Sequence, residues 1–236
     1  MYVLGIINSR RLGKSLGLDI VGVDRKRCNL QCVYCECGNG LFESERGIYA
    51  NFNDSMIELE KALSENQVDI VTFSGNGEPT LNIEIGRYID EIKRITNKPV
   101  CVITNSTLLH DEDVFNSLLR ADVVMPSLDS VDLISFTKID RPHKSVNLEL
   151  IVESLIRFSS VYRGKMFLEI FLVKSINDNI DELDKLIDVV KQINPTELHI
   201  NTVDRVPAEK IELYNDEIND IYKHFVKNLK IEVKLF

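Results

Sequence analysis

The sequence lacks the features that mark membrane, secreted and nucleic-acid-binding proteins. No run approaches the roughly 20 apolar residues that span a bilayer, and no N-terminal stretch joins a basic region to the apolar core of a signal peptide. The net charge of −9 gives no basic footprint for a phosphate backbone, so nucleic acid is a disfavoured partner. We therefore expect a cytoplasmic protein with no membrane partner.

Repeats, low-complexity tracts and Gly/Ser linkers are missing too, and the six prolines are spread along the chain. A chain of 236 residues with 44% hydrophobic residues can bury one substantial core. We expect residues 1–236 to form a single domain.

Cysteine is scarce, but its distribution is uneven. Of five cysteines, Cys28, Cys32 and Cys35 fall within one short stretch in the spacing C-x3-C-x2-C, which is no disulfide framework. Closed structural zinc sites and plant-type iron–sulfur sites take four protein ligands, so three clustered thiols indicate an iron–sulfur cluster with one iron left open. The alternative is a zinc knuckle that recruits Cys37, or thiols packed in a core. No second C-x2-C or His-x3-5-His pattern follows to complete a zinc site.

Short β-branched or aromatic runs alternate with segments of helical periodicity. The runs are 18–23, 69–73, 99–104, 122–125, 166–174 and 197–201, the clearest helical segments are 147–158 and 181–193, and Ser55 with Glu58 resembles a capping box. This alternation predicts an α/β fold with a mostly parallel sheet covered by helices. Six strands are too few for a closed eight-stranded barrel, and the pattern permits either an open barrel or a flat doubly wound sheet. In both, ligands bind at the carboxyl ends of the strands.

Polar residues collect at those predicted strand ends. They are Ser74-Gly75-Asn76-Gly77-Glu78, Thr104-Asn105, Ser127 with Asp129, Glu169, and His199 with Asn201. Glu169 stands in an otherwise apolar strand and needs water or a partner, so we expect it to face a polar cavity. Glu169 and His199 are the candidate catalytic residues. The alternatives are a helix cap for Asp129, a structural role for His199 and an inert core position for Cys101.

Two basic regions have open roles. The segment from Ser9 to Gly17 suits a phosphate or carboxylate cradle, although it lacks P-loop spacing, and it could instead close one end of the fold. Arg141-Pro142-His143 and the loop beginning at Lys174 could hold an acidic substrate group or be solvated.

The cysteine motif and its neighbours together resemble the radical S-adenosylmethionine (radical SAM) superfamily. The branch it resembles includes small radical SAM oxidoreductases and is similar to the tRNA wyosine-base synthases. The residues that carry this resemblance are Ser9-Arg10-Arg11-Leu12-Gly13, the three cysteines, Gly77-Glu78-Pro79-Thr80-Leu81, Arg141-Pro142-His143, Leu172-Val173-Lys174 with Asn177-Asp178, and Asn201-Thr202-Val203-Asp204-Arg205 with Pro207-Ala208-Glu209.

The resemblance implies an open (β/α)6 partial TIM barrel, in which Cys28, Cys32 and Cys35 hold a 4Fe–4S cluster and S-adenosylmethionine chelates the fourth iron. It implies that Tyr34 lies over the cluster near the adenine. Further contacts to S-adenosylmethionine are implied for Ser74, Gly75, Asn76, Gly77, Glu78, Thr104, Asn105, Ser127, Asp129, Val173 and Asn201.

The implied reaction is reductive cleavage of S-adenosylmethionine to a 5′-deoxyadenosyl radical, which abstracts hydrogen from a substrate that the sequence does not identify. A ferredoxin or flavodoxin would supply the electron. Alternatives are wyosine-type tRNA modification and activation of a glycyl-radical partner protein, or, in another class, a non-catalytic iron–sulfur or zinc protein for electron transfer or sensing. Only Cys37 and Cys101 remain for further clusters, which makes a tRNA substrate less expected than a small molecule or a protein.

Overall fold

The computed structural model describes residues 1–203 and 207–236, so Asp204 and Arg205 of the motif above lie outside the described residues. Its main sheet has the strand order β1-β2-β5-β6-β7-β8-β9-β10. The strands are β1 Val3–Ser9, β2 Gly13–Leu18, β5 Ile70–Phe73, β6 Val100–Thr104, β7 Val123–Pro126, β8 Lys165–Phe171, β9 Glu197–Asn201 and β10 Glu232–Leu235. Only β1 is antiparallel to its neighbour.

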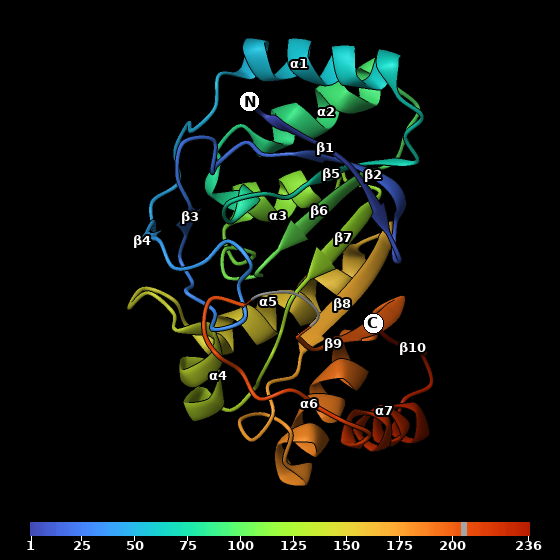
Figure 1. The fold of residues 1–236 in the computed structure, drawn as a ribbon. Coiled ribbons are helices and arrows are strands. Elements are labelled where there is room, and N and C mark those ends of the chain that lie inside the picture. Colours follow the sequence, from blue (N-terminus) through green and yellow to red (C-terminus); the bar gives the residue numbers. More distant parts are fainter. Residues whose placement is uncertain (204–206) are drawn as a thin grey trace.

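Helices follow most of the parallel strands. They are α1 Phe52–Glu65, α2 Ile85–Ile95, α3 Glu112–Leu118, α4 Leu133–Asp140, α5 Leu148–Val161, α6 Ile180–Ile193 and α7 Glu217–Asn228, with a 3-10 turn at Pro79–Leu81 and a small pair of strands, β3 Arg27–Cys28 and β4 Leu41–Phe42. Figure 1 shows the strands fanning out between α1 and α2 at one end and α6 and α7 at the other. No helix in the described residues has the length and apolar character needed to cross a membrane.

The predicted fold class, an open α/β partial barrel, is confirmed. Five of the six predicted strands correspond to β5 to β9, whereas the predicted strand 18–23 meets β2 only at Leu18. The first strand ends earlier than predicted because Asp19 stops it, its carboxylate accepting hydrogen bonds from Val21 N and Gly22 N at 3.0 and 2.6 Å. The edge strands β1 and β10 were not predicted. In β1, Leu4, Ile6 and Ile7 are all exposed, so its sequence shows no alternation of buried and exposed residues.

Both faces of the sheet are buried. One face packs against the helices through residues such as Leu18, Phe73 and Ile170. The opposite face carries a second apolar cluster of Ile70, Cys101, Val123, Met125 and Phe167. Double burial explains the near-continuous apolar strands, and it leaves polar side chains mainly at the strand ends.

The predicted capping box at Ser55 is wrong. Helix α1 begins at Phe52, and Asn51 caps it by accepting a hydrogen bond from Asp54 N at 3.1 Å. Ser55 is buried and lies 2.8 Å from the Tyr88 hydroxyl, while Glu58 accepts hydrogen bonds from Tyr2 N and Val3 N. Both side chains therefore join α1 to other elements of the fold.

Candidate functional site

The three clustered cysteines lie on the loop that follows β2 and passes the end of α4. Cys28 ends β3, and Cys35 N donates to Cys32 O at 3.1 Å. Backbone hydrogen bonds from Gln31 N to Asp140 O and from Val33 N to Ile139 O, at 2.9 and 2.8 Å, join the loop to α4. The position of Cys32 is thus fixed by a helix that lies more than 100 positions away in the sequence.

Each thiol has a different surrounding. Cys28 Sγ accepts hydrogen bonds from Leu30 N and Asn105 Nδ2, both at 3.4 Å. Cys32 Sγ donates to Asp140 Oδ1 at 3.2 Å, whereas Cys35 Sγ accepts from Lys26 Nζ at 3.1 Å.

Because their surroundings differ, the three cysteine thiols differ in pKa. Burial raises the pKa of Cys28 to about 12 and raises that of Cys32 as well. The Cys37 thiol and the Lys26 ammonium lower the pKa of Cys35. Cys35 is therefore the most readily ionised of the three.

By chemical type the donor set suits an iron–sulfur cluster, because it consists of three thiols on one loop. Asp140 Oδ2, beside Cys32, is a buried oxygen without a hydrogen-bond partner. Within 1–203 and 207–236, no group of three His, Cys, Asp or Glu side chains is placed to hold a metal ion.

The turn after β5, Ser74 to Glu78, packs directly against the segment that leads to Cys28. Arg27 N donates to Asn76 O at 3.0 Å, and Glu78 N donates to Arg27 O at 2.9 Å. Gly77 has φ +156°, and a Cβ there would lie 2.0 Å from Arg27 O. Only glycine allows this approach of the two backbones.

Glu78 is buried, and both of its carboxylate oxygens accept hydrogen bonds inside the protein. Oε1 accepts from Thr80 N, Thr80 Oγ1 and Thr104 Oγ1, and Oε2 accepts from Asn105 N at 2.7 Å. Burial raises the pKa of Glu78. Through these bonds Glu78 and Thr104 position Asn105 beside Cys28.

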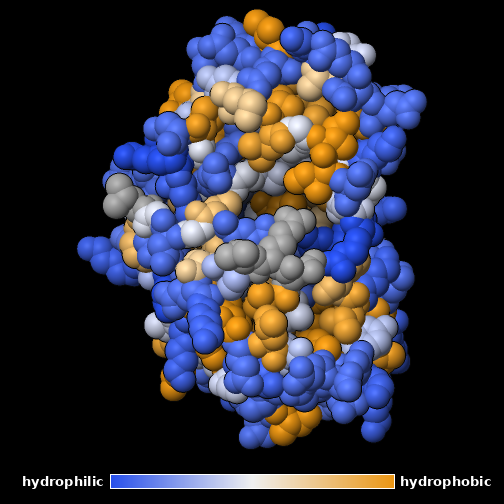
Figure 2. Space-filling model, in the orientation of Figure 1, coloured by the Kyte–Doolittle hydropathy of each residue, from blue (hydrophilic) through white to orange (hydrophobic). Residues whose placement is uncertain are grey.

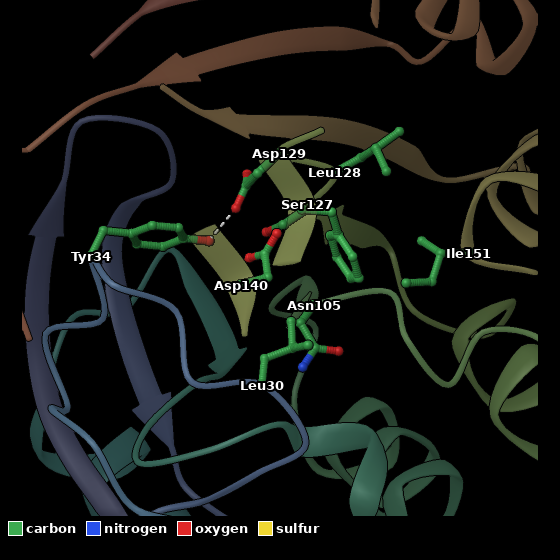
Figure 3. A pocket seen from close by; sticks show the side chains of 9 residues that line it. Leu30, Tyr34, Asn105, Ser127, Leu128, Asp129, Asp140 and Ile151 are labelled. Carbon is green, nitrogen blue, oxygen red and sulfur yellow. Dashed lines mark hydrogen bonds between the residues drawn. The ribbon is translucent and has the colours of Figure 1, made fainter. Parts of the chain in front are cut away.

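A small cavity of about 20 Å³ brings together residues from five segments (Figure 3). Tyr34 donates its hydroxyl proton to Asp129 Oδ2 at 2.5 Å, and Phe171 N donates to Asp129 Oδ1 at 2.8 Å. Burial raises the pKa of Asp129 to about 6. Ser127 lines the same cavity, so the predicted pair Ser127 and Asp129 meets the aromatic residue of the cysteine motif.

The alternative prediction that Asp129 caps a helix is wrong. Helix α4 is capped by Asp132, whose carboxylate accepts from Ile134 N and Ser135 N at 2.9 and 3.1 Å.

A larger cavity of about 440 Å³ extends from the cysteine loop to the turn between β1 and β2. The molecule is hollowed near the centre of the face drawn in Figure 2, where apolar and strongly hydrophilic residues adjoin. The walls hold Cys35, Tyr34, Ser74, Glu169, Phe171 and Asn201, with Arg10 and Arg11 at the far end. The rings of Tyr34 and Phe171 stack with their centroids 3.8 Å apart.

The two candidate catalytic residues have different positions. Glu169 lines the large cavity and forms an ion pair with Arg11, so its expected partner is a residue of the basic N-terminal segment. His199 is buried, and its Nε2 lies 2.8 Å from Glu197 Oε2. It lines neither of the two cavities, and burial lowers its pKa.

Three other predicted residues contact neighbouring residues of the protein itself. Val173 is buried beside Val33 and Ile139. Arg141 pairs with Glu209, and Lys174 pairs with Glu212 and Glu217 at 3.0 and 2.8 Å. Neither basic residue lines the two cavities, so the prediction that they hold an acidic group in a cavity has no support in this arrangement.

Sequence reasoning missed Lys26, Asp140 and Asp19. Lys26 and Asp140 touch cysteine sulfurs, and Asp19 Oδ2 accepts from Asn76 N at 2.9 Å beside Gly75. No local pattern pointed to them, because each acts on a residue from another segment.

Comparison with a family model identifies the family of this chain, and curated relatives match most of its length. The family model of the radical SAM superfamily matches residues 25–190. A protein of Brachyspira hyodysenteriae named GTPase Obg is 40% identical, over 98% of this chain and 34% of its own length. A UPF0026 protein of Methanocaldococcus jannaschii is 36% identical, over 87% of this chain and 64% of its own length.

Solved structures share the fold. Streptococcus suis SuiB bound to S-adenosylmethionine has a TM-score of 0.70 at 16% identity, covering 93% of this chain and 50% of SuiB. TYW1 with a bound lysine-pyruvate adduct has a TM-score of 0.67 at 16% identity, covering 91% of this chain and 73% of TYW1. The chain thus spans about a third to two thirds of these curated relatives and about half of SuiB.

Proposed function

The chain belongs to the radical SAM superfamily, and we propose that it is an enzyme of that family whose cluster is held by Cys28, Cys32 and Cys35. Its cofactors are a 4Fe–4S cluster and S-adenosylmethionine. When bound, they would supply the reductive cleavage of S-adenosylmethionine, which gives a 5′-deoxyadenosyl radical that abstracts hydrogen from the substrate. The observation that carries the proposal is the loop of three thiols at the carboxyl ends of parallel strands, with Cys35 opening onto the large cavity.

Residues around this loop divide into those that touch the cavities and those that support them. Ser74 and Asn201 line the large cavity, Asn105, Ser127 and Asp129 line the small one, and Tyr34 lines both. We assign S-adenosylmethionine to the region that these side chains surround. The remaining predicted contacts, Gly75, Asn76, Gly77, Glu78, Thr104 and Val173, then support the turn, position Asn105 and pack behind the site.

The substrate belongs, in this proposal, at the end of the large cavity toward Arg10, Arg11 and Glu169. Glu169 is the better candidate to orient substrate, because His199 lines neither of the described cavities. A cavity of about 440 Å³ that also takes the cofactor suits a small molecule or a protein segment. The TYW1 structure holds a lysine-pyruvate adduct.

The electron must come from an external reductant, as in other members of the family. We propose a ferredoxin or flavodoxin in this role. We also propose that residues 1–236 fold as one domain, since a single buried cluster includes both Val3 and Val233.

Anaerobic reconstitution of the full chain with iron and sulfide tests the proposal. Cys28→Ala, Cys32→Ala and Cys35→Ala should each lose the paramagnetic signal of the dithionite-reduced cluster. Cys101→Ala is the matched control, because Cys101 is buried in the sheet away from the cysteine loop, and it should keep the signal. Cys37→Ala should keep it as well.

Added S-adenosylmethionine should change the spectrum of the reduced wild-type protein. If the cluster is loaded and reduced but its spectrum does not change when S-adenosylmethionine is added, the proposal is contradicted and the electron-transfer or sensing alternative is favoured. Loss of metal in Cys37→Ala together with the other three variants would favour a four-thiol zinc site.

A further inference from the structure

One ammonium group of the cysteine loop points at a cysteine sulfur. Lys26 Nζ lies 3.1 Å from Cys35 Sγ and donates to it. The two residues are nine positions apart and are brought together by the fold of the loop. The contact joins a cation to the thiol that faces the large cavity.

Two glycines of the same loop fix the Lys26 side chain. Lys26 Nζ also donates to Gly38 O at 2.5 Å, and Gly38 N donates to Cys35 O at 3.1 Å. A Cβ on Gly40 would lie 2.9 Å from Lys26 Cβ, which is closer than real Cβ contacts come. Gly38 therefore anchors the ammonium and Gly40 leaves room for its stem.

The other two sulfurs have no such cation among their hydrogen-bond partners in the described residues. Cys28 Sγ accepts from a backbone amide and from the Asn105 side chain, both neutral donors. Cys32 Sγ contacts the Asp140 carboxyl group. The environment of the three thiols is therefore asymmetric, with the positive charge at Cys35.

We propose that Lys26 tunes the reduction potential of the cluster through its hydrogen bond to Cys35, an inference that rests on the proposed function. Reduction adds one electron to the cluster and changes no covalent bond of the chain. The added negative charge is stabilised by a nearby cation, and hydrogen bonds to ligand sulfurs are known to set such potentials. Lys26 thus raises the potential and eases the transfer of the electron from the external reductant.

A redox titration of the reconstituted full chain, followed by the paramagnetic signal without S-adenosylmethionine, tests this role. In Lys26→Met the ratio of reduced to oxidised cluster at a fixed potential should fall about tenfold, which is about 59 mV for one electron. Arg25→Met removes the same charge from the neighbouring, exposed position and should change the ratio less than about twofold. Lys26→Arg should recover part of the loss.

The inference is overturned if the reduction potential of Lys26→Met equals that of the wild-type chain or that of Arg25→Met. The proposed function still stands in that case, because the variant retains the paramagnetic signal of the cluster. Failure of the wild-type chain to form any cluster would instead overturn the proposed function. If Lys26→Met loads no cluster, Gly40→Ala replaces it, because it displaces Lys26 and keeps the charge. Its potential should move in the same direction, and an unchanged value overturns the inference.

Discussion

The buried carboxylate of Glu78 joins two segments of the site directly, and a third through Asn105. Its four donors come from Thr80, Thr104 and Asn105, and Asn105 in turn contacts Cys28 Sγ. The sequence pointed to Glu78 and Asn105 through their motifs at strand ends. It did not show that one positions the other, since that depends on the register between β5 and β6.

Glu78→Gln tests this arrangement. The amide keeps the shape but turns an NH2 group toward hydrogen-bond donors, so we expect a loss of about 3 kcal/mol in the free energy of unfolding. Equilibrium denaturation in urea measures it. Glu84→Gln is the matched control, because Glu84 pairs with the largely exposed Arg87, and it should cost less than about 1 kcal/mol. Equal losses in both variants would contradict the role of Glu78.

His199 predicts a pH dependence of stability. Burial lowers its pKa in the folded chain below the ordinary value of 6.5, so between the two values the unfolded chain binds a proton that the folded chain lacks. Stability is therefore retained above about pH 6.5 and falls as the pH is lowered through this window. One such group contributes at most about 1.4 kcal/mol per pH unit.

Denaturation of the full chain without cofactors, from pH 7.5 to 5, measures this slope. His199→Gln should flatten it. An unchanged slope in His199→Gln would show that other groups cause the pH dependence.

Among the elements, the central parallel strands β5 to β9 were predictable because both of their faces are buried and their sequences are largely apolar. Strand β1 was not, since its apolar residues point largely to solvent. The start of α1 was misjudged because Ser55 and Glu58 bond to distant residues instead of to the helix end. The local sequence pattern thus indicates that an element is present, whereas tertiary contacts decide at which residue it begins.

The turn after β5 gives a prediction at this scale. In Gly77→Ala a Cβ would meet Arg27 O at 2.0 Å, so the turn must separate from the segment that carries Cys28, at a cost of about 2–4 kcal/mol. Gly5→Ala is the control, because Gly5 also has positive φ, +88°, but a Cβ there meets nothing within 4 Å. It should cost only about 1–2 kcal/mol for the backbone conformation. Thermal unfolding measures the loss of stability in both variants. Equal losses would show that the close approach of Gly77 to Arg27 is not the cause of the loss in Gly77→Ala.

In the whole molecule, the open sheet has two edges, β1 and β10, and the basic turn between β1 and β2 reaches from the first edge to the residue after β10. The guanidinium groups of Arg10 and Arg11 lie 5.9 and 5.8 Å from the ring centroid of Phe236, just after β10. Arg11 also pairs with Glu169 of β8. Of the two predicted roles of this segment, closing the fold thus has direct contacts in its favour.

A double-mutant cycle with Arg11→Gln and Glu169→Gln measures how much the contact between these two side chains stabilises the fold. Both side chains are partly buried, so we expect a coupling of about 1 kcal/mol in the free energy of unfolding. Arg157 with Glu112, an exposed ion pair on helices, provides the comparison and should couple by less. A coupling no larger than that of the exposed pair would contradict a structural role for the Arg11–Glu169 contact.

Cleavage of S-adenosylmethionine at a cluster held by three thiols can be measured in one assay. The reconstituted protein is reduced with dithionite under anaerobic conditions, S-adenosylmethionine is added, and 5′-deoxyadenosine is measured by chromatography. We expect 5′-deoxyadenosine to form with the wild-type chain and with Cys101→Ala, and to be absent with Cys32→Ala. A loaded, reduced cluster that yields no 5′-deoxyadenosine, or equal product from Cys32→Ala, would contradict it.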